Sequence, residues 1–230
     1  MNNDSDPPVA KNLVHLEVFS DYTCPWCYIG WARLEQALEQ LPEHVAVDVV
    51  WRPFEIHAEV PLEGMPVEDL PYPPDVWARM QEALRVNAAA EGLTVGNRPK
   101  VANTHRALVA SAYAQAEEPS AFGAFHAGLF VAYFAGGHDL GDPAVVDRVA
   151  RAAGLDVERM RSAIDVAPDG DESNPYEAAL EITSRDARLA GITGTPTFVF
   201  DRRFAASGAQ PVVVLLRAFE GALEARAEEV

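Results

Sequence analysis

Cys24 and Cys27 are the two cysteines of this 230-residue chain, and only two residues separate them. Two cysteines placed at random would show this spacing in about one per cent of chains of this length. Thiols this close can form and break a disulfide, which predicts redox chemistry. A structural disulfide over so short a loop would contribute only about 2 kcal/mol. A zinc site would need two further ligands, and the six histidines contain no HxxxH pattern.

The residues after the pair predict a helix over 26–41, because apolar side chains recur at helical spacing and Pro42 follows. Cys24 then faces the unpaired N–H groups at the helix start, which favour its thiolate, so we expect it to be the nucleophile. Cys27 lies on the same helix face and is expected to be the resolving thiol. Pro25 fits the first helical turn, and Trp26 is expected to be partly exposed beside the sulfurs and to offer a flat apolar surface to a substrate.

Elements on either side must position this helix. Apolar runs predict buried strands at 13–19 and 45–51, which with the helix form a parallel βαβ unit. A proline-rich stretch follows, and then a helical subdomain without strands. We therefore expect an α/β fold in three parts: 11–60, an inserted helical part over 61–175, and 176–230. The inserted helices are expected at 76–90, 101–117, 122–134, 143–153 and 157–164, and the last part as a helix at 176–190, a hairpin of 197–200 with 204–207, and a helix at 211–228.

Several further polar or aromatic residues favour structural roles over catalytic ones. His15 is expected to be a satisfied histidine within a buried strand near Cys24. Asp21 could perturb the Cys24 pKa or cap the loop. Trp77 is expected to pack in the core, and the acidic run at 169–172 reads as a solvated loop. The residues expected to line the cleft between the parts, in structural roles, are Arg52, Glu55 and His105.

The charge of the chain is strongly negative, with 18 Lys and Arg against 35 Asp and Glu. A net charge of −17 opposes binding to nucleic acids and to anionic membranes. The N-terminal residues are polar and acidic and do not resemble a secretory signal, and no segment is apolar enough to span a membrane. We therefore expect a cytoplasmic protein, in which a disulfide is usually transient and catalytic.

A second motif, Gly-Thr-Pro-Thr-Phe at 194–198, places a proline directly before a predicted strand. Together with the CxxC at a helix start, it resembles the thioredoxin fold, and the helical insertion resembles its DsbA-like branch. The stretch 19–30 (Phe-Ser-Asp-Tyr-Thr-Cys-Pro-Trp-Cys-Tyr-Ile-Gly), Trp-Arg-Pro-Phe at 51–54, Asn-Thr at 103–104 and Ser-Gly-Ala-Gln at 207–210 are similar to the FrnE-type group of that branch. The resemblance implies a cis Pro196, with Thr195 beside the two sulfurs and its backbone open to a substrate peptide. DsbA-type oxidants usually carry Pro-His between the cysteines, where this chain has Pro25-Trp26.

These observations predict a thiol-disulfide oxidoreductase that acts on client proteins or small thiols. Its redox centre is the cysteine pair, so we expect no metal and no prosthetic group, with glutathione as a conceivable co-substrate. Two alternatives stay open. One is a glutathione-dependent isomerase or transferase resembling the hydroxychromene carboxylate isomerases and the kappa-class glutathione transferases, which have serine at the position of Cys24. The other is a holdase chaperone whose thiols act as a redox switch.

Overall fold

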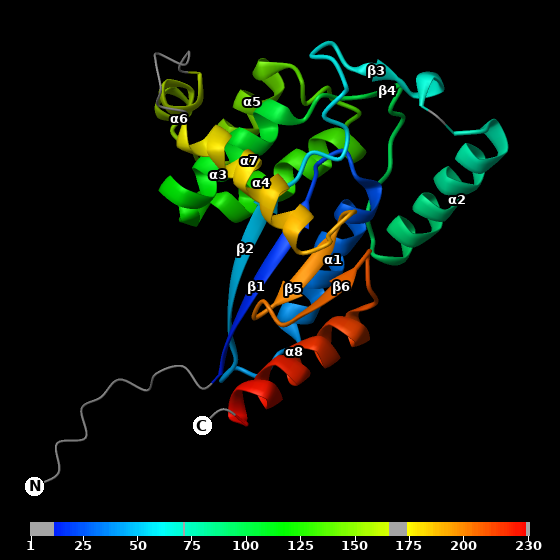
Figure 1. Cartoon of the computed structure of the whole chain (residues 1–230). Helices are drawn as coiled ribbons and strands as arrows, with labels where there is room; N and C mark the ends of the chain where they lie inside the picture. Colours follow the sequence, from blue (N-terminus) through cyan, green and yellow to red (C-terminus); the bar gives the residue numbers. More distant parts are fainter. Residues whose placement is uncertain (1–11, 71, 166–173, 229–230) are drawn as a thin grey trace, which may run out of the picture.

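A four-stranded sheet in the order β2-β1-β5-β6 forms the centre of the computed structural model, which describes residues 12–70, 72–165 and 174–228 (Figure 1). Strand β1 (Leu13–Ser20) pairs in parallel with β2 (Ala46–Pro53). On its other side β1 pairs antiparallel with β5 (Thr197–Phe200), which forms a hairpin with β6 (Phe204–Ser207). The predicted strands and the α/β class are confirmed.

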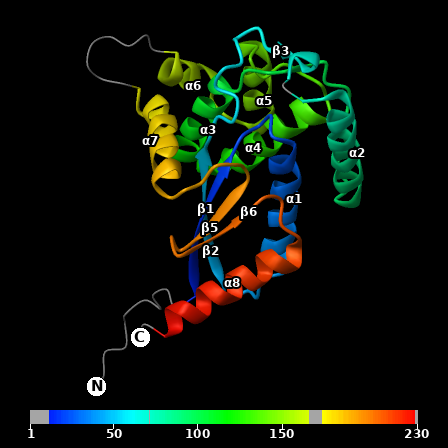
Figure 2. The ribbon, with the colours of Figure 1, turned by 45° about the vertical axis from the view of Figure 1, so that its right-hand side comes forward.

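Helices α1 (Pro25–Glu39) and α8 (Val212–Ala227) pack together on one face of this sheet. Figure 2 shows both helices alongside the strands. The period-2 alternation of β1 explains why the helices cover this face. Val14, Leu16 and Val18 all point toward it, into a core that both helices and β5 complete. Helix α7 (Pro175–Leu189) leads back from the helical part to the hairpin and contacts β2.

The helical part stands over the end of the sheet at which β1 finishes (Figure 1). Helix α2 extends to one side, while the other helices pack with one another. Their apolar core also includes Tyr22, Cys24, Cys27 and Tyr28, so the cysteine pair is buried against the helical part. The helices are α2 (Pro74–Ala90), α3 (His105–Glu117), α4 (Pro119–Phe134), α5 (Pro143–Ala153) and α6 (Val157–Ile164). None of the described helices is long and apolar enough to cross a membrane.

The helical part contains a short sheet that the sequence did not predict. Strands β3 (Met65–Pro66) and β4 (Lys100–Val101) pair antiparallel, and a single 3-10 turn, η1 (Val67–Asp69), follows β3. The helix expected from residue 101 therefore begins only at His105. Asn103 sets this start, because its side chain accepts from the His105 N–H and donates to the carbonyl oxygen of Val60.

His15 corrects a second prediction. Its side chain is about half exposed, and its Nδ1 lies 3.0 Å from Asp48 Oδ2 on the neighbouring strand. The alternation of β1 turns His15 to the opposite face from Val14 and Leu16, and Cys24 follows the far end of the strand. It is neither a core residue nor part of the cysteine site. The acidic run at 169–172 lies outside the described residues.

Candidate active site

The start of helix α1 holds Cys24 at the N-cap position and Pro25 at the first helical position. Proline is suited to this place, because its missing N–H would have had no partner within the helix. The backbone N–H groups of Cys27 and Tyr28 donate to the carbonyl oxygen of Cys24. The Cys24 side chain is 4% exposed and Cys27 is 1% exposed, so Cys27 is the more shielded thiol. Both are free thiols in this structure.

The two thiols differ in acidity. The pKa of Cys24 is lowered, chiefly by a hydrogen bond from the Cys27 thiol; burial opposes this shift, and a hydrogen bond from Thr195 adds a smaller lowering. Burial raises the pKa of Cys27 well above its ordinary value, and the Cys24 sulfur raises it further. Cys24 therefore ionises first, and the charge of its thiolate is stabilised by the thiol of its neighbour.

Thr195 and Pro196 approach this site from the far end of the chain. The Cys24 thiol donates to the carbonyl oxygen of Thr195 at 3.4 Å. The Thr195–Pro196 peptide bond is cis, as the resemblance implied. The side chain of Thr197 donates to the carbonyl oxygen of Gly194 at 2.8 Å, which ties the turn before β5. The structure thus brings together the cysteine pair and the proline motif.

Asp21 is buried beneath the loop that leads to Cys24. Its Oδ1 accepts from the backbone and the hydroxyl of Thr23, and its Oδ2 accepts from the Ile56 N–H and from Thr104. Burial raises the pKa of the Asp21 carboxyl. The carboxyl therefore ties together three loops around the cysteines, which fits the loop-capping role and places a titratable group near Cys24.

A family model for the "DSBA-like thioredoxin domain" matches residues 15–220, which spans the sheet, the helical part and the cysteine site. The chain belongs to this family. A probable DsbA oxidoreductase from Streptomyces coelicolor is 30% identical, with a TM-score of 0.79 over 91% of this chain and 89% of its own. DSBA-like domains are thiol-disulfide oxidoreductases in general, so the predicted class of the protein is confirmed at that level.

Two further similarities bear on the family. The uncharacterised protein YwbO of Bacillus subtilis (strain 168) is 28% identical over 188 residues, which cover 81% of this chain and 86% of that protein. A 2-hydroxychromene-2-carboxylate isomerase shares the fold, with a TM-score of 0.69 and 14% identity over 94% of this chain and 99% of its own. The FrnE-type subgroup stays a prediction.

A pocket of about 500 Å³ opens beside Cys24 in this DSBA-like domain. The cysteine loop forms one wall, including Pro25 and Trp26, both partly exposed as expected of Trp26. Helix α2 forms the opposite wall. Trp77 packs against the small core cluster of Val60, Leu70 and Val101, in line with its prediction as a core residue, and its partly buried side chain also forms part of that wall. Further residues that line the pocket are Leu70, Tyr72, Met80, Leu84, Arg98 and Tyr133.

Sequence reasoning missed Arg98 in this pocket. It lies in the loop between α2 and β4, where Gly96 and Pro99 leave no periodicity to show a direction for its side chain. A single arginine in a strongly acidic chain gives no signal by itself. Only the packing of the loop against Gln81 of α2 and the rings of Tyr133 and Phe134 of α4 places Arg98 in the pocket that Cys24 also lines.

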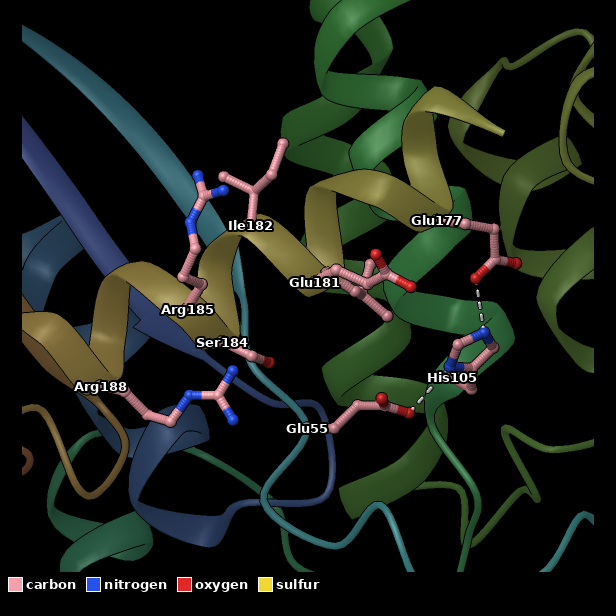
Figure 3. Close-up of a pocket in the computed structure, with 9 residues that line it drawn as sticks. Glu55, His105, Glu177, Glu181, Ile182, Ser184, Arg185 and Arg188 are labelled. Atoms are coloured by element: carbon pink, nitrogen blue, oxygen red, sulfur yellow. Dashed lines mark hydrogen bonds and ion pairs between the residues drawn. The ribbon is translucent and has the colours of Figure 1, made fainter. Parts of the chain in front are cut away.

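Glu55 and His105, two of the predicted cleft residues, lie in a different pocket, of about 510 Å³, along helix α7 (Figure 3), whereas Arg52 lies outside it. His105 sits between two carboxylates there, with Nδ1 at 3.0 Å from Glu55 and Nε2 at 2.7 Å from Glu177. These contacts raise the pKa of His105 to about 9, Glu55 being the larger cause. Arg52 pairs with Glu17 and Asp186. These ion pairs join α3, β1, β2 and α7, which fits the structural roles expected of them.

A buried polar network connects the cysteine loop to helices α3 and α4. The Tyr22 hydroxyl lies 2.6 Å from the Ser111 hydroxyl and 2.8 Å from Nδ1 of His126. Burial lowers the pKa of His126 to about 3, so the ring is neutral at physiological pH. Tyr22 and His126 contact Phe130, which anchors the cysteine loop to α4. No cluster of three metal-binding side chains occurs in the part of the chain that the structure describes.

Proposed function

We propose that this DSBA-like domain exchanges disulfides with proteins or small thiols through Cys24 and Cys27. The Cys24 thiolate attacks one sulfur of a partner disulfide, which forms a mixed disulfide and releases the other partner sulfur as a thiolate. Cys27 then loses its proton and attacks the Cys24 sulfur. This step releases the second partner thiol and leaves Cys24 and Cys27 oxidised. The reverse sequence oxidises a partner dithiol.

The opposed pKa shifts of the two thiols support this order most directly. Cys24 is the more acidic thiol and lines the pocket, whereas Cys27 is fully buried and keeps its proton. In the mixed disulfide the Cys24 sulfur is bonded to the partner and carries no charge, so it no longer opposes ionisation of Cys27. Pro25, Trp26, Thr195 and Pro196 are proposed to contact the partner, with the backbone of Thr195 as a site for an extended peptide.

The test is equilibration of the protein against glutathione redox buffers, with the thiols counted by mass spectrometry after acid quench and alkylation. The expected result is a two-electron titration, in which about 30 mV corresponds to a tenfold change in the equilibrium constant. Cys27→Ser is the matched control and should give only a mixed disulfide at Cys24. A pair that does not titrate would contradict the proposal. A reduction potential near or above that of the cytosolic glutathione pool indicates an oxidant or isomerase. A reduction potential far below it indicates a reductase.

A glutathione-dependent isomerase is the second candidate, because a pocket of about 500 Å³ beside the nucleophile is large enough for a small molecule. Turnover of a small substrate that persists in Cys27→Ser would favour it, since an isomerase needs no resolving thiol. The holdase alternative predicts that Cys24→Ser still suppresses aggregation of an unfolded protein. A cytoplasmic location remains part of the proposal.

A further inference from the structure

Arg98 presents a positive charge at the pocket beside Cys24 without a carboxylate to neutralise it. Among the described residues, no Asp or Glu oxygen lies within ion-pair distance of its guanidinium, although the chain carries a net charge of −17. Most arginines of the structure do have such a partner; Arg33 and Arg52 are examples. An uncompensated cation in a partly buried position favours an anion from outside the protein.

The hydrogen bonding of Arg98 is equally incomplete. A guanidinium carries five N–H donors. In the described structure one of them reaches an acceptor, from Nη2 to Oε1 of Gln81 at a long 3.3 Å, while the buried Nε has none. Burial also lowers the pKa of Arg98. The unpaired N–H groups of a guanidinium lie in one plane, and this arrangement matches the two oxygens of a carboxylate.

Two aromatic rings hold the guanidinium in place. Its central carbon lies 4.6 Å from the ring centroid of Phe134 and 5.7 Å from that of Tyr133. Phe134 in turn stacks on Tyr28 of helix α1, with ring centroids 4.7 Å apart. These two contacts restrain the guanidinium, so less side-chain freedom is lost when an anion binds.

The remaining walls of the pocket are largely apolar. Trp26 and Cys24 face it from one side, and Trp77, Met80 and Leu84 from helix α2. Tyr72 stacks beside Trp77, with ring centroids 6.2 Å apart. Pockets of about 300–1,000 Å³ hold single small molecules, and the 500 Å³ here falls within that range. An extended polypeptide would instead run along an open groove.

We infer that the pocket binds a small disulfide with an apolar, ring-sized body and a carboxylate, which Arg98 holds while a sulfur of that disulfide meets Cys24. This inference rests on the proposed thiol exchange and names its substrate class. In the exchange the Cys24 thiolate bonds to one sulfur of the small disulfide and its S–S bond breaks. Cys27 then displaces that sulfur. The small disulfide is reduced to two thiols, and the cysteine pair is oxidised.

Two aromatic disulfides, one with carboxylates and one without, test the role of the charge. Dithiobis(nitrobenzoate) carries a carboxylate on each ring, whereas dithiodipyridine is neutral at the working pH. Reduced protein is mixed with each disulfide, and the rate of thiol release is followed against its concentration. In Arg98→Gln we expect the second-order rate constant for the carboxylate disulfide to fall by about tenfold, as for loss of a charged hydrogen bond. The rate for the neutral disulfide should stay within about twofold of the wild type.

Controls separate this effect from changes in folding or overall charge. Arg79→Gln removes an equal charge from α2, but Arg79 is exposed and paired with Asp75, so the ratio of the two rates should not change. Arg98→Lys keeps the charge without the planar fork and should give an intermediate ratio, which also covers a failure of Arg98→Gln to fold. Equal losses for both disulfides, or no loss for either, would overturn the inference and leave the proposed exchange intact. Failure of the wild type to react with either disulfide at Cys24 would instead overturn the proposed function.

Discussion

Gly30 lies directly against the ring of Pro196. A Cβ atom on Gly30 would approach Pro196 Cγ to 2.9 Å and Phe198 Cζ to 3.3 Å. The two residues are far apart in the sequence, yet helix α1 and the turn before β5 meet at this point. The close approach depends on the missing side chain, and the same packing keeps Thr195 beside Cys24.

Gly30→Ala should therefore impair exchange. The added methyl group must displace Pro196 or α1, because both neighbouring atoms belong to rings packed near or within the core. We expect a loss of about 1–3 kcal/mol in the free energy of unfolding from overpacking. A shift of the Thr195 carbonyl should also slow thiol exchange by about tenfold or more. Denaturant unfolding and exchange rates with a small disulfide measure the two effects.

Gly221→Ala is the matched control for this substitution. Gly221 lies within helix α8, and a Cβ there would meet no atom within 4 Å. The higher helix propensity of alanine should make this variant more stable by about 0.5–1 kcal/mol, with no change in exchange. If Gly30→Ala behaves in the same way, the proposed contact does not control the site.

The sequence predicted those parts of the site that depend on local patterns. The CxxC spacing and the helix start placed Cys24, Pro25 and Cys27, since N-cap chemistry involves only a few neighbouring residues. Thr195 and Pro196 required the family resemblance. Periodicity could not predict the pocket, because its walls come from distant segments whose packing decides which side chains meet Cys24.

The errors and omissions each have a physical cause. Trp77 has the spacing of a core residue and does pack against a small core cluster, but the spacing could not show that it also lines the pocket. The alternation of β1 separates His15 from Val14 and Leu16, and the prediction was wrong because it treated the strand as buried on both faces. The short strands β3 and β4 contain only two residues each, too few to produce an alternation.

The acidity of Cys24 should depend on the thiol of Cys27, which is the largest cause of its lowered pKa. Cys27→Ala removes this donor, so the pKa of Cys24 should rise. Cys27→Ser keeps a hydroxyl donor at the same place and should preserve part of the shift. The ultraviolet absorbance of the thiolate, followed against pH, gives the pKa in each variant. An unchanged pKa in Cys27→Ala would mean that the helix N-terminus or Thr195 is the main cause.

His126 should make the fold sensitive to acid. Burial lowers its pKa to about 3, whereas an unfolded histidine has its ordinary value of 6.5. Between these values the unfolded chain binds a proton that the folded chain excludes, so stability falls as pH decreases from 6.5 toward 3. The cost should be on the order of several kcal/mol at the acid end. In His126→Gln this contribution disappears, so denaturant unfolding at a series of pH values should show a shallower acid loss. If the free energy of unfolding decreased equally in both proteins at acid pH, that result would contradict a neutral, buried His126.

His105 should act in the opposite direction at alkaline pH. Its pKa is raised to about 9 by Glu55 and Glu177, so the folded protein holds a proton that the unfolded chain releases near pH 6.5. The stabilisation is complete below 6.5 and is lost as pH rises through 9. Because the ring is 42% exposed, we expect at most about 1 kcal/mol from it. The stability difference between the wild type and His105→Gln should shrink over this range. Glu55→Gln should lower the pKa of His105 more than Glu177→Gln does, since Glu55 makes the larger contribution to the shift. The pH range over which His105 stabilises the fold should then end at a lower pH in Glu55→Gln. Equal effects of the two glutamate variants would show that the charges, and not the hydrogen bond to Glu55, set the pKa of His105.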